Sequence, residues 1–194
     1  MAEGEKTIEM TKSKPIISSG FLLNLGFAFP SVSVPGAPSS SSFQTNLEIG
    51  NQWYFAKTDK YGIGLKVSWF QFGYGSKSED LLGKTLRTYN IDLRFIKVAP
   101  MFSYAINDDM ALDAYVDLSP TVIIQGNELI GSIGAGLLFV PGARFRYKKF
   151  AFGFDTSIGS MNTASTFVDD DTDFEIPDYK ASYFIPRIYV GFKF

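Results

Sequence analysis

The chain has 194 residues, a formal net charge of −2, and neither cysteine nor histidine. Its length suits one domain, and its 45% hydrophobic and 20% charged residues exclude a disordered chain and a soluble coiled coil. The two missing residue types exclude disulfides, thiolate or imidazole metal sites and histidine-based triads, and the lack of a basic cluster excludes nucleic acid as an expected partner.

The chain opens with a polar stretch over residues 2–14, which we expect to be an N-terminal tail. We expect the chain to begin near the mature N-terminus of an exported protein, with its signal peptide not present. Residues 21–29 follow, where Phe and Leu at odd positions alternate with Leu, Asn, Gly and Ala at even positions. This period of two predicts a strand with one apolar face.

Seven further segments show the same alternation between a bulky apolar face and a small or polar face. In the third of them the phase shifts by one residue near Ile96 and Lys97, which predicts a β-bulge. The sequence therefore predicts eight strands in all. The seven segments are residues 43–55, 61–72, 88–104, 110–122, 130–147, 150–159 and 183–194.

The connections between these strands alternate in length. Three are tight polar turns at residues 57–60, 107–109 and 148–149. The other four are predicted to be long loops, over residues 31–42, 75–86, 123–129 and 160–181. An even number of antiparallel strands with this arrangement predicts an all-β fold, an eight-stranded antiparallel transmembrane up-and-down β-barrel of the bacterial outer membrane. The expected organisation is a tail over residues 1–14 and a barrel over residues 15–194.

Alternation alone leaves a soluble, lipocalin-like barrel with an apolar cavity as the competing fold. The apolar face is dense in Phe, Leu, Val and Ile, whereas the other face holds Gly, Ala, Ser, Tyr and charges of both signs. Bulky side chains suit the convex exterior, and small ones suit the crowded interior of an eight-stranded barrel. Aromatic residues such as Trp53, Tyr61, Tyr104 and Tyr147 also gather near the tight turns, as an interfacial girdle requires. We therefore expect lipid to contact the Phe/Leu face.

The C-terminus carries a family resemblance. The chain ends in Phe194, with Phe192, Val190 and Ile188 at every second position before it. This ending resembles the signal by which outer-membrane barrels reach the insertion machinery. With its eight strands, the chain is similar to small barrels of the OmpA/OmpX type, including those common in Bacteroidota. The resemblance implies a location in the outer membrane, in contact with its lipid and lipopolysaccharide, but it carries over no site residue.

Charged residues on the polar face form the candidate site. An eight-stranded barrel is filled by its own side chains, so these carboxylates and cations are expected to neutralise one another in the lumen. The alternative interpretation is a path for protons or a small solute. The predicted lumen charge network comprises Glu48, Lys66, Asp92, Arg94, Asp113, Asp117, Arg144, Arg146, Asp155 and Arg187.

The sequence offers residues for two other chemistries, calcium binding and carboxylate catalysis. The acidic loop offers Asp169, Asp171 and Asp173 as a weak calcium candidate, because that spacing supplies alternate oxygen ligands. An EF-hand is excluded, since Phe174 takes the place of the required glycine and Lys180 that of the final glutamate. Without histidine, and with Asp113 and Asp117 too far apart for a carboxylate dyad, we expect no enzyme and no cofactor.

The sequence thus predicts a non-enzymatic outer-membrane barrel with surface loops and a structural or protein-interaction role. An accessory subunit of a larger membrane complex, with a partner protein in the membrane, is one form of that role. The alternative is a transporter or narrow channel for a small hydrophobic solute. Its support is the set of outward-facing prolines, which remove ladder hydrogen bonds: Pro100, Pro120, Pro141 and Pro186.

Overall fold

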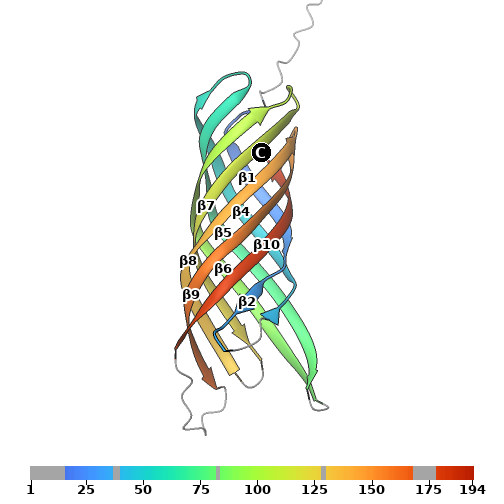
Figure 1. Cartoon of the computed structure of the whole chain (residues 1–194). Coiled ribbons are helices and arrows are strands. Elements are labelled where there is room, and N and C mark those ends of the chain that lie inside the picture. The colour runs from blue at the N-terminus through green and yellow to red at the C-terminus, as the bar shows by residue number, and fades with distance from the viewer. Residues whose placement is uncertain (1–15, 37–39, 82–83, 128–129, 168–177) are drawn as a thin grey trace, which may run out of the picture.

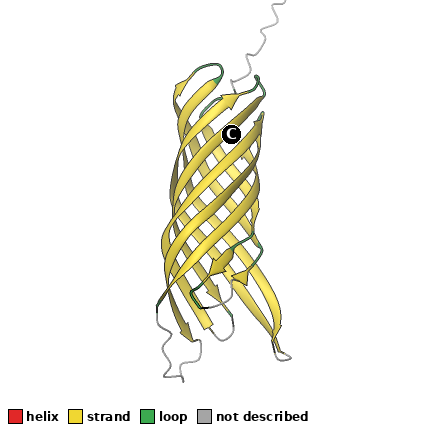
Figure 2. Ribbon diagram, in the orientation of Figure 1, coloured by secondary structure: helices red, strands yellow, loops and turns green. Residues whose placement is uncertain are grey.

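A computed structural model describes residues 16–36, 40–81, 84–127, 130–167 and 178–194, and every regular element in these ranges is a strand (Figure 2). The strands are β1 Gly20–Ala28, β2 Ser31–Ser33, β3 Ser40–Ser41, β4 Gln44–Lys57, β5 Tyr61–Leu81, β6 Lys84–Ala105, β7 Met110–Gly126, β8 Ile130–Tyr147, β9 Phe150–Phe167 and β10 Tyr179–Lys193.

Eight of these strands close into a barrel. Neighbours in the chain pair in antiparallel fashion from β4 to β10, and β1 closes the ring by pairing with both β4 and β10. Leu25 marks the closure, opposite Leu47 on one side and Val190 on the other. Strands β2 and β3 extend the β1–β4 hairpin past this ring, and β2 pairs with β10. The predicted eight-stranded up-and-down barrel is confirmed.

The two ends of the barrel differ. The tight turns between β4 and β5, β6 and β7, and β8 and β9 lie at one end, together with the C-terminus (upper end in Figure 1). We call this the short-turn end. The other end, the long-loop end, carries the remaining connections.

The long connections predicted from the sequence are wrong in their extent. Instead of a loop over residues 75–86, β5 runs to Leu81 and β6 begins at Lys84. Likewise β7 continues to Gly126, β9 to Phe167, and β2 and β3 occupy part of residues 31–42. On the β5 extension Ser76, Lys77 and Ser78 are all exposed, so both faces of this strand contact water. The alternation that identifies a half-buried strand is then lost.

The predicted β-bulge on β6 is confirmed. The register between β6 and β7 shifts between Arg94 and Val98, and Ile96 has a φ of 50°. A β-branched residue rarely adopts this left-handed conformation, so the surrounding ladder must hold it in place. The bulge leaves Phe95 and Ile96 both facing outwards and turns Lys97 into the lumen.

The two faces of the wall match the predicted assignment. Outward apolar side chains are exposed, including Phe55 at 73% and Ile63 at 59%, whereas inward polar ones such as Gln52 and Ser103 are fully buried. No helix among the described residues is long and apolar enough to cross a membrane. A continuous apolar exterior on a closed ladder is stable only when lipid covers it, so the barrel spans a membrane.

We expect the folded protein to resist SDS until it is heated. Closure pairs the backbone groups of every wall strand and leaves no edge in the membrane for detergent to open. The measurement is electrophoretic mobility with and without boiling, and the unboiled protein should migrate differently. Identical mobility, together with solubility in the absence of detergent, would contradict the membrane barrel.

Candidate functional site

The lumen holds all ten charged residues that the sequence predicts there. Each has an exposed fraction of 4% or less, although charged side chains are seldom fully buried in proteins unless they are paired. Every strand of the ring except β1 contributes at least one of them. They are Glu48, Lys66, Asp92, Arg94, Asp113, Asp117, Arg144, Arg146, Asp155 and Arg187.

Six groups form one connected set, the central charge network: Glu48, Lys66, Lys97, Asp117, Asp155 and Arg187. Glu48 lies 3.2 Å from the Lys66 ammonium, 2.8 Å from that of Lys97 and 2.7 Å from the Arg187 guanidinium. Lys66 also reaches Asp117 at 3.1 Å, and Arg187 reaches Asp155 at 2.5 Å. Three carboxylates thus face three cations, so the network is neutral as a whole.

Two tyrosines fill the space beside this network. The Tyr115 and Tyr189 hydroxyls are 2.7 Å apart, and Tyr115 donates to Asp155 over 3.2 Å. The Lys66 ammonium lies 4.2 Å from the centre of the Tyr115 ring, a cation–π contact. Gly153 makes room for Tyr189, because a Cβ atom at that position would overlap the tyrosine ring.

A second group, the Asp113 cluster, lies closer to the short-turn end. Asp113 accepts hydrogen bonds from Arg144 and Arg146, each at 2.8 Å, and from the Ser103 hydroxyl at 2.6 Å. Arg146 also donates to the Tyr54 hydroxyl. One carboxylate between two guanidiniums leaves an excess of positive charge at this level of the lumen.

The N-terminal segment covers that positive level. Ile16 and Ile17 are 7% and 2% exposed and pack against Ala105 and Ala111 inside the short-turn mouth. The Ile16 carbonyl accepts a hydrogen bond from Arg146 at 2.5 Å. The Lys193 ammonium donates to both the backbone carbonyl and the side-chain hydroxyl of Ser18. Oxygen atoms of the N-terminal segment therefore supply additional acceptors for two of the cations at this level. The predicted tail over residues 1–14 lies outside the described residues.

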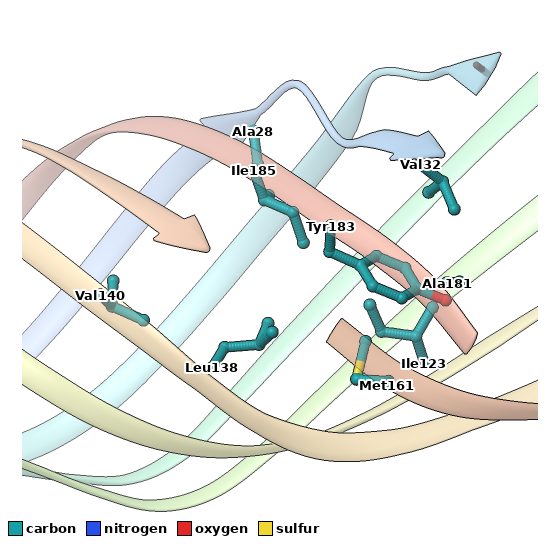
Figure 3. Close-up of a cluster of buried hydrophobic side chains, with 9 residues drawn as sticks. All are labelled: Ala28, Val32, Ile123, Leu138, Val140, Met161, Ala181, Tyr183 and Ile185. Atoms are coloured by element: carbon teal, nitrogen blue, oxygen red, sulfur yellow. The ribbon is translucent and has the colours of Figure 1, made fainter. Parts of the chain in front are cut away.

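The lumen towards the long-loop end is apolar, a feature that the alternation pattern does not predict (Figure 3). Leu138 and Val140 on β8 point inwards and are 0% and 1% exposed, and they meet residues of β1, β2, β7, β9 and β10. The signal in the sequence was that both faces of residues 137–140 are apolar. The apolar cluster comprises Ala28, Val32, Ile123, Leu138, Val140, Met161, Ala181, Tyr183 and Ile185.

Lys97 is the charged member of the central network that the predicted set omits. Its ammonium contacts Glu48 and donates to the Gln71 side chain at 2.8 Å. The phase shift near Ile96 was the available signal, since a one-residue shift exchanges the face of every residue that follows it. A further ion pair, Asp92 with Arg94 at 2.6 Å, is held by a hydrogen bond to Ser157.

The arrangement can neutralise buried charge and fill the barrel. Its carboxylates are committed to cations at hydrogen-bond distance, and the described residues hold no group of three Asp or Glu side chains placed to bind a metal ion. The calcium candidates Asp169, Asp171 and Asp173 lie outside the described residues.

One hairpin projects past its neighbours at the long-loop end (green, lower right in Figure 1). Strand β5 pairs with β4 only as far as Tyr74, which lies opposite Thr45. Strand β6 pairs with β7 only as far as Tyr89, which lies opposite Gly126. The ladder between β5 and β6 nevertheless continues to Leu81 and Lys84. Beyond Tyr74 and Tyr89, no other strand of the described chain pairs with either edge of this hairpin.

Comparisons with known proteins identify the fold. No family model matches the chain, and no curated protein matches its sequence. It is similar in structure to Ail, the attachment invasion locus protein of Yersinia pestis, with 12% identity and a TM-score of 0.53 over 92% of this chain and 100% of that one. The outer membrane protease OmpT from Escherichia coli matches with 10% identity and a TM-score of 0.50, over 91% and 95% of the two chains. The chain therefore has the fold of small outer-membrane β-barrels.

We expect the reconstituted protein to conduct almost no ions. An eight-stranded barrel has room only for its own side chains. Four layers obstruct this lumen in turn: the N-terminal segment inside the short-turn mouth, the Asp113 cluster, the central charge network and the apolar cluster. The measurement is current across a planar bilayer under applied voltage. Stable, ion-selective channels formed by the wild-type protein would contradict the filled lumen.

Proposed function

We propose that this protein is a non-enzymatic interaction protein of the bacterial outer membrane, which binds a partner protein at the cell surface by strand addition. The observation that carries the proposal is the β5–β6 hairpin, with both edges unpaired past Tyr74 and Tyr89. Short turns on the periplasmic side and longer loops outside are the rule for such barrels, which puts the hairpin at the cell surface.

The direction of the backbone groups on β5 supports strand addition. The Tyr74 carbonyl points towards β4, where it accepts a hydrogen bond from the Thr45 hydroxyl. Alternate residues of a strand direct their N–H and C=O groups to the same edge, so Ser76 and Ser78 present theirs to that side. No strand of the described chain pairs with them there. These groups are a template for an extended segment of another protein.

The edge of the hairpin formed by β6 also presents unpaired backbone groups. Arg87 pairs with Ser78 across the hairpin, so its backbone groups point to the opposite edge, beyond the last β7 pair. Serine and arginine on these edges oppose association between copies of the hairpin, because polar and charged edge residues disfavour indiscriminate strand pairing. The partner that fits is an extended peptide segment or the edge strand of another protein. An accessory role in a membrane complex is one setting for this contact.

The membrane-facing contacts follow from the wall. Outward Phe and Leu side chains are suited to the acyl chains of lipid and lipopolysaccharide. The exposed terminal Phe194, at 65%, packs against Phe21 and Phe192, and it is the residue that the insertion machinery would recognise. The non-enzymatic part of the proposal rests on buried, paired carboxylates. Since OmpT is a protease, peptide cleavage by the purified barrel is the activity to assay, and we expect none.

The test of strand addition is a pair of proline substitutions with matched controls. Ser78→Pro and Arg87→Pro each remove an outward N–H while leaving the inward ladder of the hairpin intact. Ser78→Ala and Arg87→Ala change the same side chains but retain the N–H. A photo-crosslinker placed beside the edge, at Ser76, should capture a partner protein in intact cells. The proline variants should lose that product and the alanine variants keep it. Equal capture by all four variants would overturn strand addition.

Transport of a small hydrophobic solute is the second candidate function. Two prolines in the barrel wall support it. The registered pairs between β6 and β7 pass from Val98 to Met101, and those between β8 and β9 from Phe139 to Gly142, so Pro100 and Pro141 lie where the ladder is interrupted. Uptake of a labelled apolar solute into vesicles that contain the protein would favour this candidate. Replacing both prolines with valine should then abolish the uptake.

A further inference from the structure

A polar recess lies in the long-loop mouth of the barrel, beside the base of the β5–β6 hairpin. Its volume is about 130 Å³, enough for several water molecules or one small ligand. Strands β2, β3, β5, β6 and β7 contribute to its walls. The lining residues that matter here are Val32, Ser42, Gly75, Ser76, Asn90 and Gln125.

The register explains why a recess forms at this level. Gly75 on β5 is opposite Asn90 on β6, and Asn90 is opposite Gln125 on β7, so the three lie in one row across the wall. Gly75 has no side chain to fill the space between its neighbours. A Cβ atom at Gly75 would overlap the Phe43 carbonyl, so the strands approach too closely there for any larger residue.

A buried amide oxygen without a partner marks this row. Asn90 is 6% exposed, and its Oδ1 atom has no hydrogen-bond partner among the described residues. Gln44 on β4 does not line the recess, and its side-chain amide lies deeper in the lumen, beside Gly73. It is fully buried, and both of its side-chain polar atoms also lack a partner in the described part of the chain. A buried polar group without a hydrogen bond is destabilising, so such a group in a recess indicates a site for a ligand that supplies one.

The lining restricts the chemistry of that ligand. Hydroxyl groups of Ser42 and Ser76 and the amide of Gln125 both donate and accept hydrogen bonds. Lys77 is the charged residue among the described lining residues, which include no Asp or Glu, and Val32 supplies an apolar surface from β2. The free acceptor of Asn90 needs a donor, which a sulfate or phosphate oxygen does not offer. A compact ligand with several hydroxyl groups and a C–H face satisfies all of these groups.

We propose that this recess binds one sugar ring, as a carbohydrate subsite at the surface mouth of the barrel. The Asn90 amide accepts from a sugar hydroxyl, the serine hydroxyls and Gln125 hold the neighbouring ones, and Val32 contacts the C–H face of the ring. Ser76 belongs both to the recess and to the hairpin edge, but the proposal rests on the Asn90 amide and not on the unpaired backbone groups of that edge.

The test uses isotope-labelled full-length protein in phospholipid nanodiscs, which avoids detergents with sugar head groups. Glucose, galactose and N-acetylglucosamine are titrated separately, and sulfate is titrated as the anionic comparison. We expect at least one sugar to shift the backbone amide resonances of Asn90 and Gln125 in a saturable manner, and sulfate to leave them unchanged. Saturation by sulfate with no response to any sugar would overturn the proposal in favour of an anion site.

A pair of variants shows whether Asn90 carries the binding. Asn90→Leu removes the amide at nearly constant size, whereas Asn162→Leu, at an exposed position of β9, is the matched control. A heat-dependent shift in gel mobility confirms that both variants fold. Asn90→Leu should weaken sugar binding about tenfold, the effect expected for one lost hydrogen bond, and the control should leave it unchanged. Equal affinity in both variants, or no saturable shift with any sugar in the wild type, would overturn the proposal.

Discussion

Replacing Arg187 with alanine is expected to lower the free energy of unfolding by about 3–5 kcal/mol, because it leaves two buried carboxylates without their cation. The Arg187 guanidinium lies 2.7 Å from Glu48 and 2.5 Å from Asp155, and all three side chains are nearly inaccessible. It also donates to the Gln71 amide oxygen at 3.1 Å. Glu48 retains Lys66 and Lys97 in the variant, whereas Asp155 retains, among the described residues, only the Tyr115 hydroxyl as a hydrogen-bond donor.

The measurement is equilibrium unfolding by urea in lipid vesicles, followed by tryptophan fluorescence. Two controls are built into the structure. Arg144→Ala should cost less, because Asp113 keeps its hydrogen bonds to Arg146. Lys148→Ala removes an ion pair whose side chains are 56% and 54% exposed, and we expect about 0–1 kcal/mol there. If all three variants were equally stable, the central charge network would not support the barrel.

Phe139→Arg is expected to destabilise the inserted barrel by about 2–4 kcal/mol, the cost of a charge on the lipid face near the middle of the membrane. Phe139 lies near the centre of β8, is 49% exposed, and is flanked by Leu118 and Ile158 on the adjacent strands. No lumen group can reach the new guanidinium, since the closed wall separates the two faces. The variant should therefore fold into vesicles in lower yield and unfold at lower urea concentration.

The matched control is Phe55→Arg. Phe55 also faces outwards, at 73% exposure, but it lies two residues before the end of β4, where an arginine reaches the membrane surface. We expect a cost of about 0–1 kcal/mol there. Equal effects of the two substitutions would mean that position along the strand has no influence on the cost. A stable Phe139→Arg variant would instead show that this face does not contact lipid.

Side-chain alternation predicts a strand only where the two faces of that strand meet different environments. Alternation locates β4 and β10 well, because each has one face against lipid along most of its length. It fails where a loop is predicted over residues 75–86, because β5 continues through Ser76, Lys77 and Ser78, which are all exposed, and no environment distinguishes its two faces there. It also fails over residues 137–140, because an apolar lumen opposite lipid leaves both faces apolar and the period of two disappears.

The sequence by itself determined the fold class, the number of wall strands, the face towards lipid, the bulge near Ile96 and ten of the charges that point inwards. All of these follow from the local alternation of side chains along a strand, a property that each segment carries without its neighbours. Only the tertiary structure decided which charges meet. Glu48 and Arg187 are 139 residues apart and are brought to 2.7 Å by the closure of β1 against β10 and the tilt of the strands. The same holds for Arg146 with the Ile16 carbonyl and for the recess beside Gly75, because strand register around a closed ring is a property of the whole wall.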